Sequence, residues 1–443
     1  MINVKRISII LIILLLLPLT ACTTQEPAQQ IPEDRYSMHF GINGGAYPDI
    51  HEGEQAVYTV TKELDKLGMI WLRQIGRGSA WYEVQSDKNV WDWSKYDAVI
   101  KNNKHPWIME VYGQTGTVYP FIGEWSREYL ESLGGKQEIM NYIKDHSVDL
   151  NDAEQNADAE LYVKMFVSRY KDKIEYWEIG NEGINSPDRF EIVTNTYIWI
   201  KEEFPGAVVV LTGVAGDNNN LFNEGIESMD ELLAKGMGNY FDVGNFHYYG
   251  KIEEDFEMQL EQRYDDYKAV LDKYGVEKPI WVTETCTSSA TNSVLSGPSS
   301  EELQAQHVVK RLVIFSAKGA EKVLWHDYRD THEDNMFYQC NLVDSDTNIP
   351  KPAYYTFKLV VEKLGYYETV EKLRGNNIWL YKFVNDDNVV YVAWGSGELL
   401  LSDLGLEKAQ VTHIIEEEGI TEPETEIILT SVITLSESPV FLQ

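Results

Sequence analysis

Residues 174–182 read Ile-Glu-Tyr-Trp-Glu-Ile-Gly-Asn-Glu, and the organisation of the chain is best approached from here. The first six of these residues are rich in β-branched and aromatic side chains, which predicts a short strand. Gly180 ends that strand, so Asn181 and Glu182 fall on the loop just past its C-terminal end. In a barrel of parallel strands with helices outside, active sites are built at this end of the strands.

A second stretch, residues 279–284, repeats the pattern with the sequence Pro-Ile-Trp-Val-Thr-Glu. It predicts another apolar strand that ends in a carboxylate, Glu284. Glu182 and Glu284 are 102 positions apart, which leaves room for three strand–helix units of roughly 30 residues or more each. The two strand ends then lie across the mouth of one barrel. Two carboxylates delivered to one face in this way are what hydrolysis of a glycosidic bond requires.

The region from residue 36 to residue 365 alternates between strand and helix patterns. We expect eight apolar segments, each followed by a helical pattern, to form a (β/α)8 TIM barrel. These segments lie at residues 39–43, 69–73, 106–111, 174–179, 207–212, 241–247, 279–284 and 322–326. From residue 366 to residue 443, short strand patterns separated by turn residues predict a small β-sandwich domain. The predicted fold class is therefore α/β, a barrel with a C-terminal sandwich.

The N-terminus carries the pattern of an export signal. Residues 1–21 have a charged start and a short apolar core. This core is shorter than the apolar segment that a transmembrane helix needs to cross a bilayer. The sequence Leu-Thr-Ala-Cys at 19–22 resembles the lipobox of bacterial lipoproteins, which implies cleavage before Cys22 and lipid attachment to its sulfur. Residues 22–35 then form a flexible tether, and the protein is expected outside the cytoplasm, anchored to a membrane surface. An ordinary secretory signal is the alternative.

The chain is strongly acidic, with a formal net charge of −33 over 443 residues. Such a surface opposes binding to nucleic acid and argues mildly against a polyanionic substrate, although a local basic pocket would override the second argument. Besides Cys22 the chain has two cysteines, Cys286 and Cys340. The sequence favours two separate thiols but leaves a disulfide open, because it does not supply the geometry. It does not indicate the oligomeric state.

Three further side chains are candidates for the site. Arg73 closes an apolar strand, where a guanidinium needs a carboxylate to offset its desolvation; a surface salt bridge is the alternative. Trp81 and Trp325 are candidates to stack on sugar rings, against the alternative that they pack in the core. Histidine and acidic residues between positions 326 and 334 lack a recognised metal spacing, and no cofactor fingerprint occurs, so neither a metal nor a cofactor is expected.

Several of these stretches resemble clan A glycoside hydrolases, and family 39 among them. Residues 177–182 are similar to the Asn-Glu signature that ends strand four, where the glutamate is the acid/base and the asparagine binds the sugar hydroxyl next to the anomeric carbon. Residues 281–284 are similar to the strand-seven nucleophile motif. The tripeptide His247-Tyr248-Tyr249 resembles the His-x-Tyr motif ending strand six, whose tyrosine hydrogen-bonds the nucleophile.

The resemblance also extends to Arg73, which matches a strand-two arginine beside the nucleophile, and to Trp325, which matches a tryptophan that floors the subsite for the cleaved sugar. It implies a retaining hydrolase that cleaves β-glycosidic bonds in an oligo- or polysaccharide, with Glu284 as nucleophile and Glu182 as acid/base. A carbohydrate-binding lipoprotein without turnover and a transglycosylase on the same barrel are the alternatives. The sugar, the linkage and the choice between exo and endo action are not readable from the sequence.

Overall fold

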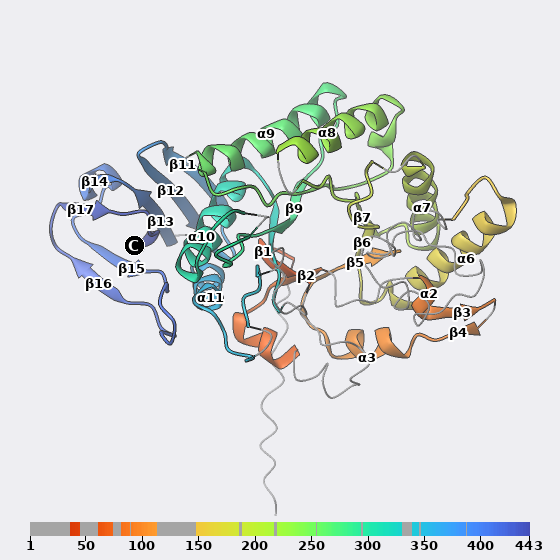
Figure 1. Cartoon of the computed structure of the whole chain (residues 1–443), viewed down its shortest axis with the longest axis horizontal. Coiled ribbons are helices and arrows are strands. Elements are labelled where there is room, and N and C mark those ends of the chain that lie inside the picture. Colours follow the sequence, from red (N-terminus) through yellow and green to blue (C-terminus); the bar gives the residue numbers. More distant parts are fainter. Residues whose placement is uncertain are drawn as a thin grey trace, which may run out of the picture. The chain divides into compact units, whose positions relative to one another are not determined.

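The computed structural model describes residues 36–44, 61–73, 81–88, 90–112, 148–185, 188–216, 219–253, 255–293, 296–329, 339–344, 347–386 and 388–443. Eight parallel strands in this part of the chain form one sheet (Figure 1). They are β1 (Phe40–Asn43), β2 (Trp71–Arg73), β5 (Trp107–Val111), β6 (Tyr176–Ile179), β7 (Val208–Val210), β8 (Gly244–His247), β9 (Ile280–Thr285) and β10 (Lys322–His326). Each overlaps one of the eight strands predicted from the sequence.

The sheet closes on itself. Its strand order is β7-β6-β5-β2-β1-β10-β9-β8, and a parallel bridge between Val210 and Val243 joins the two outer strands. The backbone N–H of Leu211 donates to the carbonyl of Val243 at 3.0 Å across the same seam. Parallel strands, consecutive in order and closed in this way, make the (β/α)8 barrel that the sequence predicts, and the fold class is confirmed.

Helices cover the outside of this barrel. They are α3 (Ser94–Asn102), α6 (Ala153–Tyr170), α7 (Arg189–Glu203), α8 (Asn219–Ala234), α9 (Phe256–Lys273), α10 (Glu301–Lys318) and α11 (Pro352–Leu364). Their ends follow local sequence signals: at α10, for example, the Ser300 hydroxyl accepts a hydrogen bond from the N–H of Leu303 at 3.1 Å, and Gly319 ends the helix at a φ of 107°. Between β2 and α3 lie a short helix, α2 (Trp81–Val84), and a hairpin of β3 (Gln85–Asp87) and β4 (Val90–Trp91).

The C-terminal strands form a β-sandwich. A six-stranded antiparallel sheet has the order β11 (Thr369–Arg374), β12 (Ile378–Asn385), β13 (Asn388–Gly395), β18 (Val440–Leu442), β15 (Ala409–His413) and β16 (Thr425–Ile428). A two-stranded sheet pairs β14 (Gly397–Leu400) with β17 (Val432–Leu435).

The alternation of side chains along β12 explains how this domain packs. Trp379, Tyr381 and Phe383 join the large apolar core that includes the barrel, whereas Leu380 points into a separate core of the sandwich. Because successive residues of a strand face opposite sides, one strand serves both cores. The Trp394 indole of β13 also donates to Glu257 of α9 at 3.1 Å, so polar contacts accompany the apolar packing of the two parts.

The expectations for the N-terminus concern residues outside the described ranges, because the export signal, Cys22 and the tether all fall before residue 36. Among the residues that the structure does describe, none of the helices combines the length and the apolar character needed to cross a membrane.

Candidate active site

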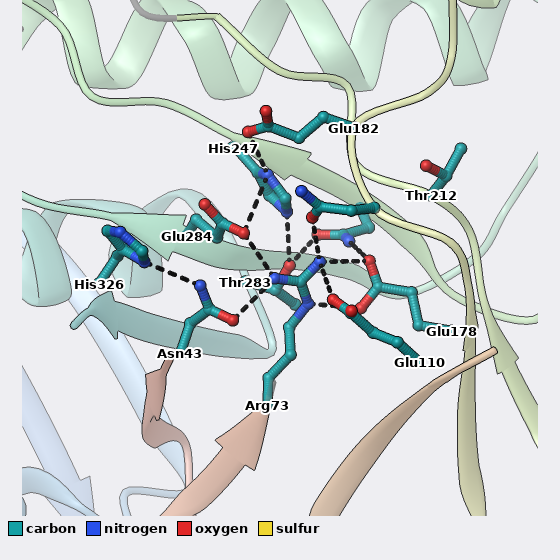
Figure 2. Close-up of polar contacts among 12 residues, drawn as sticks. Asn43, Arg73, Glu110, Glu178, Glu182, Thr212, His247, Thr283, Glu284 and His326 are labelled. Carbon is teal, nitrogen blue, oxygen red and sulfur yellow. Dashed lines mark hydrogen bonds and ion pairs between the residues drawn. The ribbon is translucent and has the colours of Figure 1, made fainter. Parts of the chain in front are cut away.

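Arg73, at the C-terminal end of β2, lies at the centre of a buried polar network at the barrel mouth (Figure 2). Its Nε and Nη2 donate to the two oxygens of Glu178 at 2.5 and 2.8 Å. Its Nη1 donates to Glu284 Oε1 at 2.6 Å and to Asn43 Oδ1 at 2.8 Å, and Nη2 also donates to Asn181 Oδ1 at 2.8 Å. Burial alone would lower the pKa of this guanidinium, but the surrounding carboxylates, Glu178 foremost, raise it well above its ordinary value.

Glu284 reaches this network because β9 carries a β-bulge. The pairing register shifts against both neighbouring strands, so that His247 of β8 lies opposite Glu284 and Trp325 of β10 opposite Thr285. A bulge inserts one residue and resets the alternation of side chains. Thr283 and Glu284 therefore both face the network, although consecutive residues of a regular strand point to opposite sides (Figure 2).

The surroundings of Glu284 hold it in its ionised form. Its side chain is 5% exposed, and besides the contact with Arg73 it accepts a hydrogen bond from the Tyr249 hydroxyl. Burial acts to raise the pKa of this carboxyl, but its electrostatic interactions with His247, Arg73 and His326, together with the Tyr249 hydrogen bond, outweigh it and lower the pKa to about 2. A carboxylate in such a setting is charged at any pH near neutrality.

Glu182 lies on the loop after β6 and is the more exposed of the two carboxylates, with a side chain 38% exposed. The preceding Gly180 has a φ of 66°, a conformation that glycine adopts without strain, and this turn directs the loop over the barrel mouth. The buried His247 lies between the pair: its Nδ1 is 2.9 Å from Glu182 Oε1 and 3.6 Å from Glu284 Oε1. Burial would lower the pKa of His247, but Glu284 and Glu182 together raise it above its ordinary value.

His326, and not Trp325, is the side chain of β10 that faces the site. Trp325 is fully buried, and its indole N–H donates to the carbonyl of Cys340 at 2.9 Å. His326 instead accepts a hydrogen bond at Nδ1 from Asn43 at 2.9 Å, and its ring lies edge-on to that of Tyr249. The predicted substrate-binding role of Trp325 is corrected here. The reason is the two-residue period of a strand, which puts neighbouring residues on opposite faces.

Trp81 also packs in the core. It is 1% exposed, its ring stacks on that of Tyr162 with 5.0 Å between centroids, and its indole N–H donates to Gln85 at 2.7 Å. A ring covered in this way offers no face to a sugar, so the predicted substrate-binding role of this residue is corrected too. The alternative that the sequence left open, packing in the core, describes it.

The structure thus brings six predicted site residues together: Arg73, Asn181, Glu182, His247, Tyr249 and Glu284. Sequence reasoning missed a further set that completes the network: Asn43, Glu110, Glu178, Asn245, Thr283 and His326. A signal for some of them exists. Glu110 and Glu178 are carboxylates inside apolar strands, and a buried charge requires a partner of opposite charge, which the nearby arginine provides.

Glu182, His247 and Glu284 also form a group whose ligand atoms lie within 4.8 Å of one another, as a metal site requires. Their present partners favour a hydrogen-bonded network instead. Both oxygens of Glu284 already accept hydrogen bonds, one of them from a guanidinium that would repel a cation at this place. The donor set therefore fits a proton-transfer site better than a cation site.

Cys286 and Cys340 form a disulfide, with their Cα atoms 5.8 Å apart. The sequence favoured two separate thiols, and this interpretation is wrong. The two residues are 54 positions apart, and their proximity depends on the closure of the barrel. The disulfide links Cys340, which follows β10, to Cys286, which follows β9. Glu284 lies two residues before Cys286.

Comparisons with known proteins bear on the class of this protein. Residues 194–351 match the family described as Glycosyl hydrolase catalytic core. Endo-1,4-beta-xylanase B of Thermotoga neapolitana is 20% identical over 298 residues, which cover 61% of this chain and 73% of that protein. A family 39 glycoside hydrolase from Bacteroides cellulosilyticus WH2 superimposes with a TM-score of 0.61 and 16% identity, covering 92% of this chain and 81% of the other. A monomeric beta-xylosidase from Caulobacter crescentus does so with a TM-score of 0.57 and 14% identity, over 92% and 96%.

The family match and the fold indicate the class of enzyme to which this chain corresponds. The barrel has the fold of the solved glycoside hydrolases named above, and residues 194–351 match the core of a glycosyl hydrolase. The chain is an O-glycosyl hydrolase whose substrate is a carbohydrate, as the sequence predicts.

Proposed function

We propose that this enzyme hydrolyses β-glycosidic bonds with retention of configuration, with Glu284 as the nucleophile and Glu182 as the acid/base. One observation carries the proposal: an oxygen of Glu182 and an oxygen of Glu284 lie within 4.8 Å of each other. Retaining enzymes hold their carboxyl groups about 5 to 5.5 Å apart, whereas inverting enzymes need about 6.5 to 9.5 Å to admit a water molecule.

The two carboxylates have environments suited to different roles. Glu284 accepts hydrogen bonds from Arg73 and Tyr249 and has its pKa lowered to about 2, so it stays ionised and can act as a nucleophile. Glu182 is more exposed, contacts no arginine side chain within the described residues, and shares a hydrogen bond with His247. This difference supports Glu182 as the group that carries a proton to the leaving oxygen.

The reaction then proceeds in two displacements. In the first, a Glu284 oxygen forms a bond to the anomeric carbon while the bond to the leaving oxygen breaks, and Glu182 gives its proton to that oxygen. In the second, Glu182 takes a proton from water, the water oxygen bonds to the anomeric carbon, and the Glu284 ester bond breaks. Because Asn181 Oδ1 accepts from Arg73, its amide Nδ2 is the group left to donate to a sugar hydroxyl.

Rates of two variants and the configuration of their products test this assignment. E182A and E284A should each lose at least about a hundredfold in kcat/KM on an aryl β-glycoside. Azide should restore turnover of E284A and give a glycosyl azide of inverted configuration. E426A, which removes an exposed glutamate of β16, is the matched control. Near-normal activity of either site variant would remove that residue from its role, and an inverted product from the unmodified enzyme would exclude retention.

The names of the similar proteins indicate which substrates should be assayed first. An aryl β-xyloside, an aryl β-glucoside and xylan are the first probes, because a xylanase and a xylosidase are among the proteins this chain resembles. Product analysis at high acceptor concentration separates hydrolysis from transglycosylation. Binding of glycans without cleavage of any of them would instead favour the carbohydrate-binding alternative.

We also propose that the enzyme acts outside the cytoplasm, held to a membrane surface by a lipid on Cys22. The support is the Leu-Thr-Ala-Cys sequence at the end of the apolar segment. Metabolic labelling with a radioactive fatty acid tests it. The unmodified chain should incorporate the label and partition with membranes, whereas C22S should do neither. Unlabelled protein released into the soluble fraction would favour an ordinary secretory signal.

A further inference from the structure

His247 contacts both carboxylates of the site, so the placement of its proton matters for the reaction. A neutral imidazole carries one proton, on Nδ1 or on Nε2, and the hydrogen bond at one nitrogen determines which. Here Nδ1 faces Glu182 Oε1 at 2.9 Å, and Nε2 faces the Thr283 hydroxyl at 2.9 Å. A hydroxyl both donates and accepts, so this contact alone does not assign the proton.

The assignment follows from Arg73, because a guanidinium only donates hydrogen bonds. Glu178 receives two of them, in the bidentate geometry of an ionised carboxylate, and can therefore only accept. The Asn245 amide lies 3.0 Å from Glu178 Oε1, so the atom that contacts it must be the donor, Nδ2. The other atom of the same amide, Oδ1, is thereby turned toward Thr283.

The amide oxygen of Asn245 can only accept a hydrogen bond. The Thr283 hydroxyl, whose oxygen lies 2.8 Å from it, must therefore donate its single hydrogen to this oxygen. The Thr283 oxygen then remains as an acceptor for His247, and the proton of that contact belongs to Nε2. With Nε2 protonated, Nδ1 is the nitrogen that gains and loses a proton, and Nδ1 is the atom directed at Glu182 (Figure 2).

We propose that Thr283 and Asn245 are positioning residues that fix the Nε2–H tautomer of His247, so that Glu182 and His247 Nδ1 share one proton. The proton lies either on Glu182, which then donates to Nδ1, or on Nδ1, which then donates to Glu182. Both arrangements use the same two atoms and need no rotation of the ring. The proposal rests on the proposed function only for the role of Glu182 as the acid/base.

The groups that act on His247 set the direction of the expected effect. Glu284 and Glu182 favour its charged form, whereas burial and Arg73 disfavour it. The oxygen of Thr283 adds an acceptor for Nε2–H, and the charged ring needs an acceptor at each nitrogen. Loss of the Thr283 hydroxyl therefore makes Glu182 and His247 bind their shared proton less tightly. Under the proposed function, the alkaline limb of kcat/KM then moves to lower pH.

Nitrogen-15 NMR of the unmodified enzyme tests the tautomer without any measurement of activity. Long-range correlations between ring protons and ring nitrogens distinguish neutral Nε2–H from neutral Nδ1–H. The chain has nine histidines, and the signals that disappear in H247Q belong to His247. At a pH where this ring is neutral, the Nε2–H pattern supports the proposal, and the Nδ1–H pattern overturns it. The result stands even if E182A proves that Glu182 is not the acid/base.

Variants of Thr283 test the consequence for the reaction. T283V keeps the shape of the side chain but removes the hydroxyl, and it should move the alkaline limb down by about one pH unit, the size of one lost hydrogen bond to a charged group. T283S restores the hydroxyl and should restore the limb. T412V makes the same change at a buried threonine of β15 in the C-terminal sandwich. This control variant should leave the alkaline limb unchanged. A normal limb in T283V, or an equal shift in T283S, would overturn the proposal; if T283V fails to fold, the NMR result decides.

Discussion

Replacement of Glu284 by glutamine should destabilise the folded protein, because its surroundings favour a negative charge at this position. The pKa of this carboxyl falls from an ordinary value of 4.5 to about 2 in the folded state. At about 1.36 kcal/mol for each pKa unit, the charged form gains about 3 kcal/mol from folding. Glutamine is nearly the same size but carries no charge, so E284Q loses this contribution while it keeps the packing.

The sign of the pH dependence follows from the direction of the shift. A carboxyl whose pKa is lower in the folded state stabilises that state fully above its unfolded value of 4.5, and the contribution is lost as the pH falls toward 2. The difference in stability between the unmodified protein and E284Q should therefore be about 3 kcal/mol at pH 7 and should shrink steadily below pH 4.5.

Urea unfolding of both proteins at pH 7, 5 and 3, followed by tryptophan fluorescence, measures this difference. E426Q, a change at an exposed glutamate of β16, controls for the general effect of losing one negative charge from an acidic protein. The competing effect is repulsion between Glu284 and its neighbour Glu182, whose relief in E284Q would stabilise the variant. An E284Q protein as stable as the unmodified one at pH 7, or a difference that does not change with pH, would refute the reasoning.

Four further variants probe the site and its surroundings. Y249F removes a donor from Glu284, so the pKa of that carboxyl should rise and the acid limb of kcat/KM should move up by about one pH unit; an unmoved limb counts against the contact. H326A should raise KM about tenfold if this ring binds substrate, whereas W325F should mainly lower the stability of the fold. A raised KM in W325F with a normal KM in H326A would instead support substrate binding by Trp325. The double variant C286S/C340S loses a disulfide across 54 positions and should lose about 4 kcal/mol in urea unfolding; an unchanged midpoint would show that the bond does not stabilise the fold.

Much of the architecture is encoded in local patterns. The eight barrel strands follow from short apolar segments that alternate with helical patterns, and the glutamates at the ends of β6 and β9 mark the functional face. Asp152 and Ser300 cap α6 and α10 as residues of these types do elsewhere. Such signals involve residues close together in the chain, so they can be recognised without knowledge of the neighbours in space.

The errors arose where a neighbour in space matters. The assignment of Trp325 to the site follows its resemblance to a strand-eight tryptophan, whereas the strands beside β10 fix which of its residues faces the site. Trp81 was taken for a binding residue, although Tyr162 of α6 covers its ring. The pairing of Cys286 with Cys340 joins residues 54 positions apart, which only the folded barrel brings together.

The class of fold, and the two glutamates to which we assign the chemistry, can be read from local patterns along the chain. Only the tertiary structure decided which side chains complete the site. The bulge at Thr283 turns two consecutive residues toward one network, and Arg73 of β2 joins residues from β1, β6 and β9 through directed hydrogen bonds. The physical reason is that strand and helix patterns depend on neighbours along the chain, whereas register, burial and the direction of a hydrogen bond depend on groups that only the closed barrel brings together.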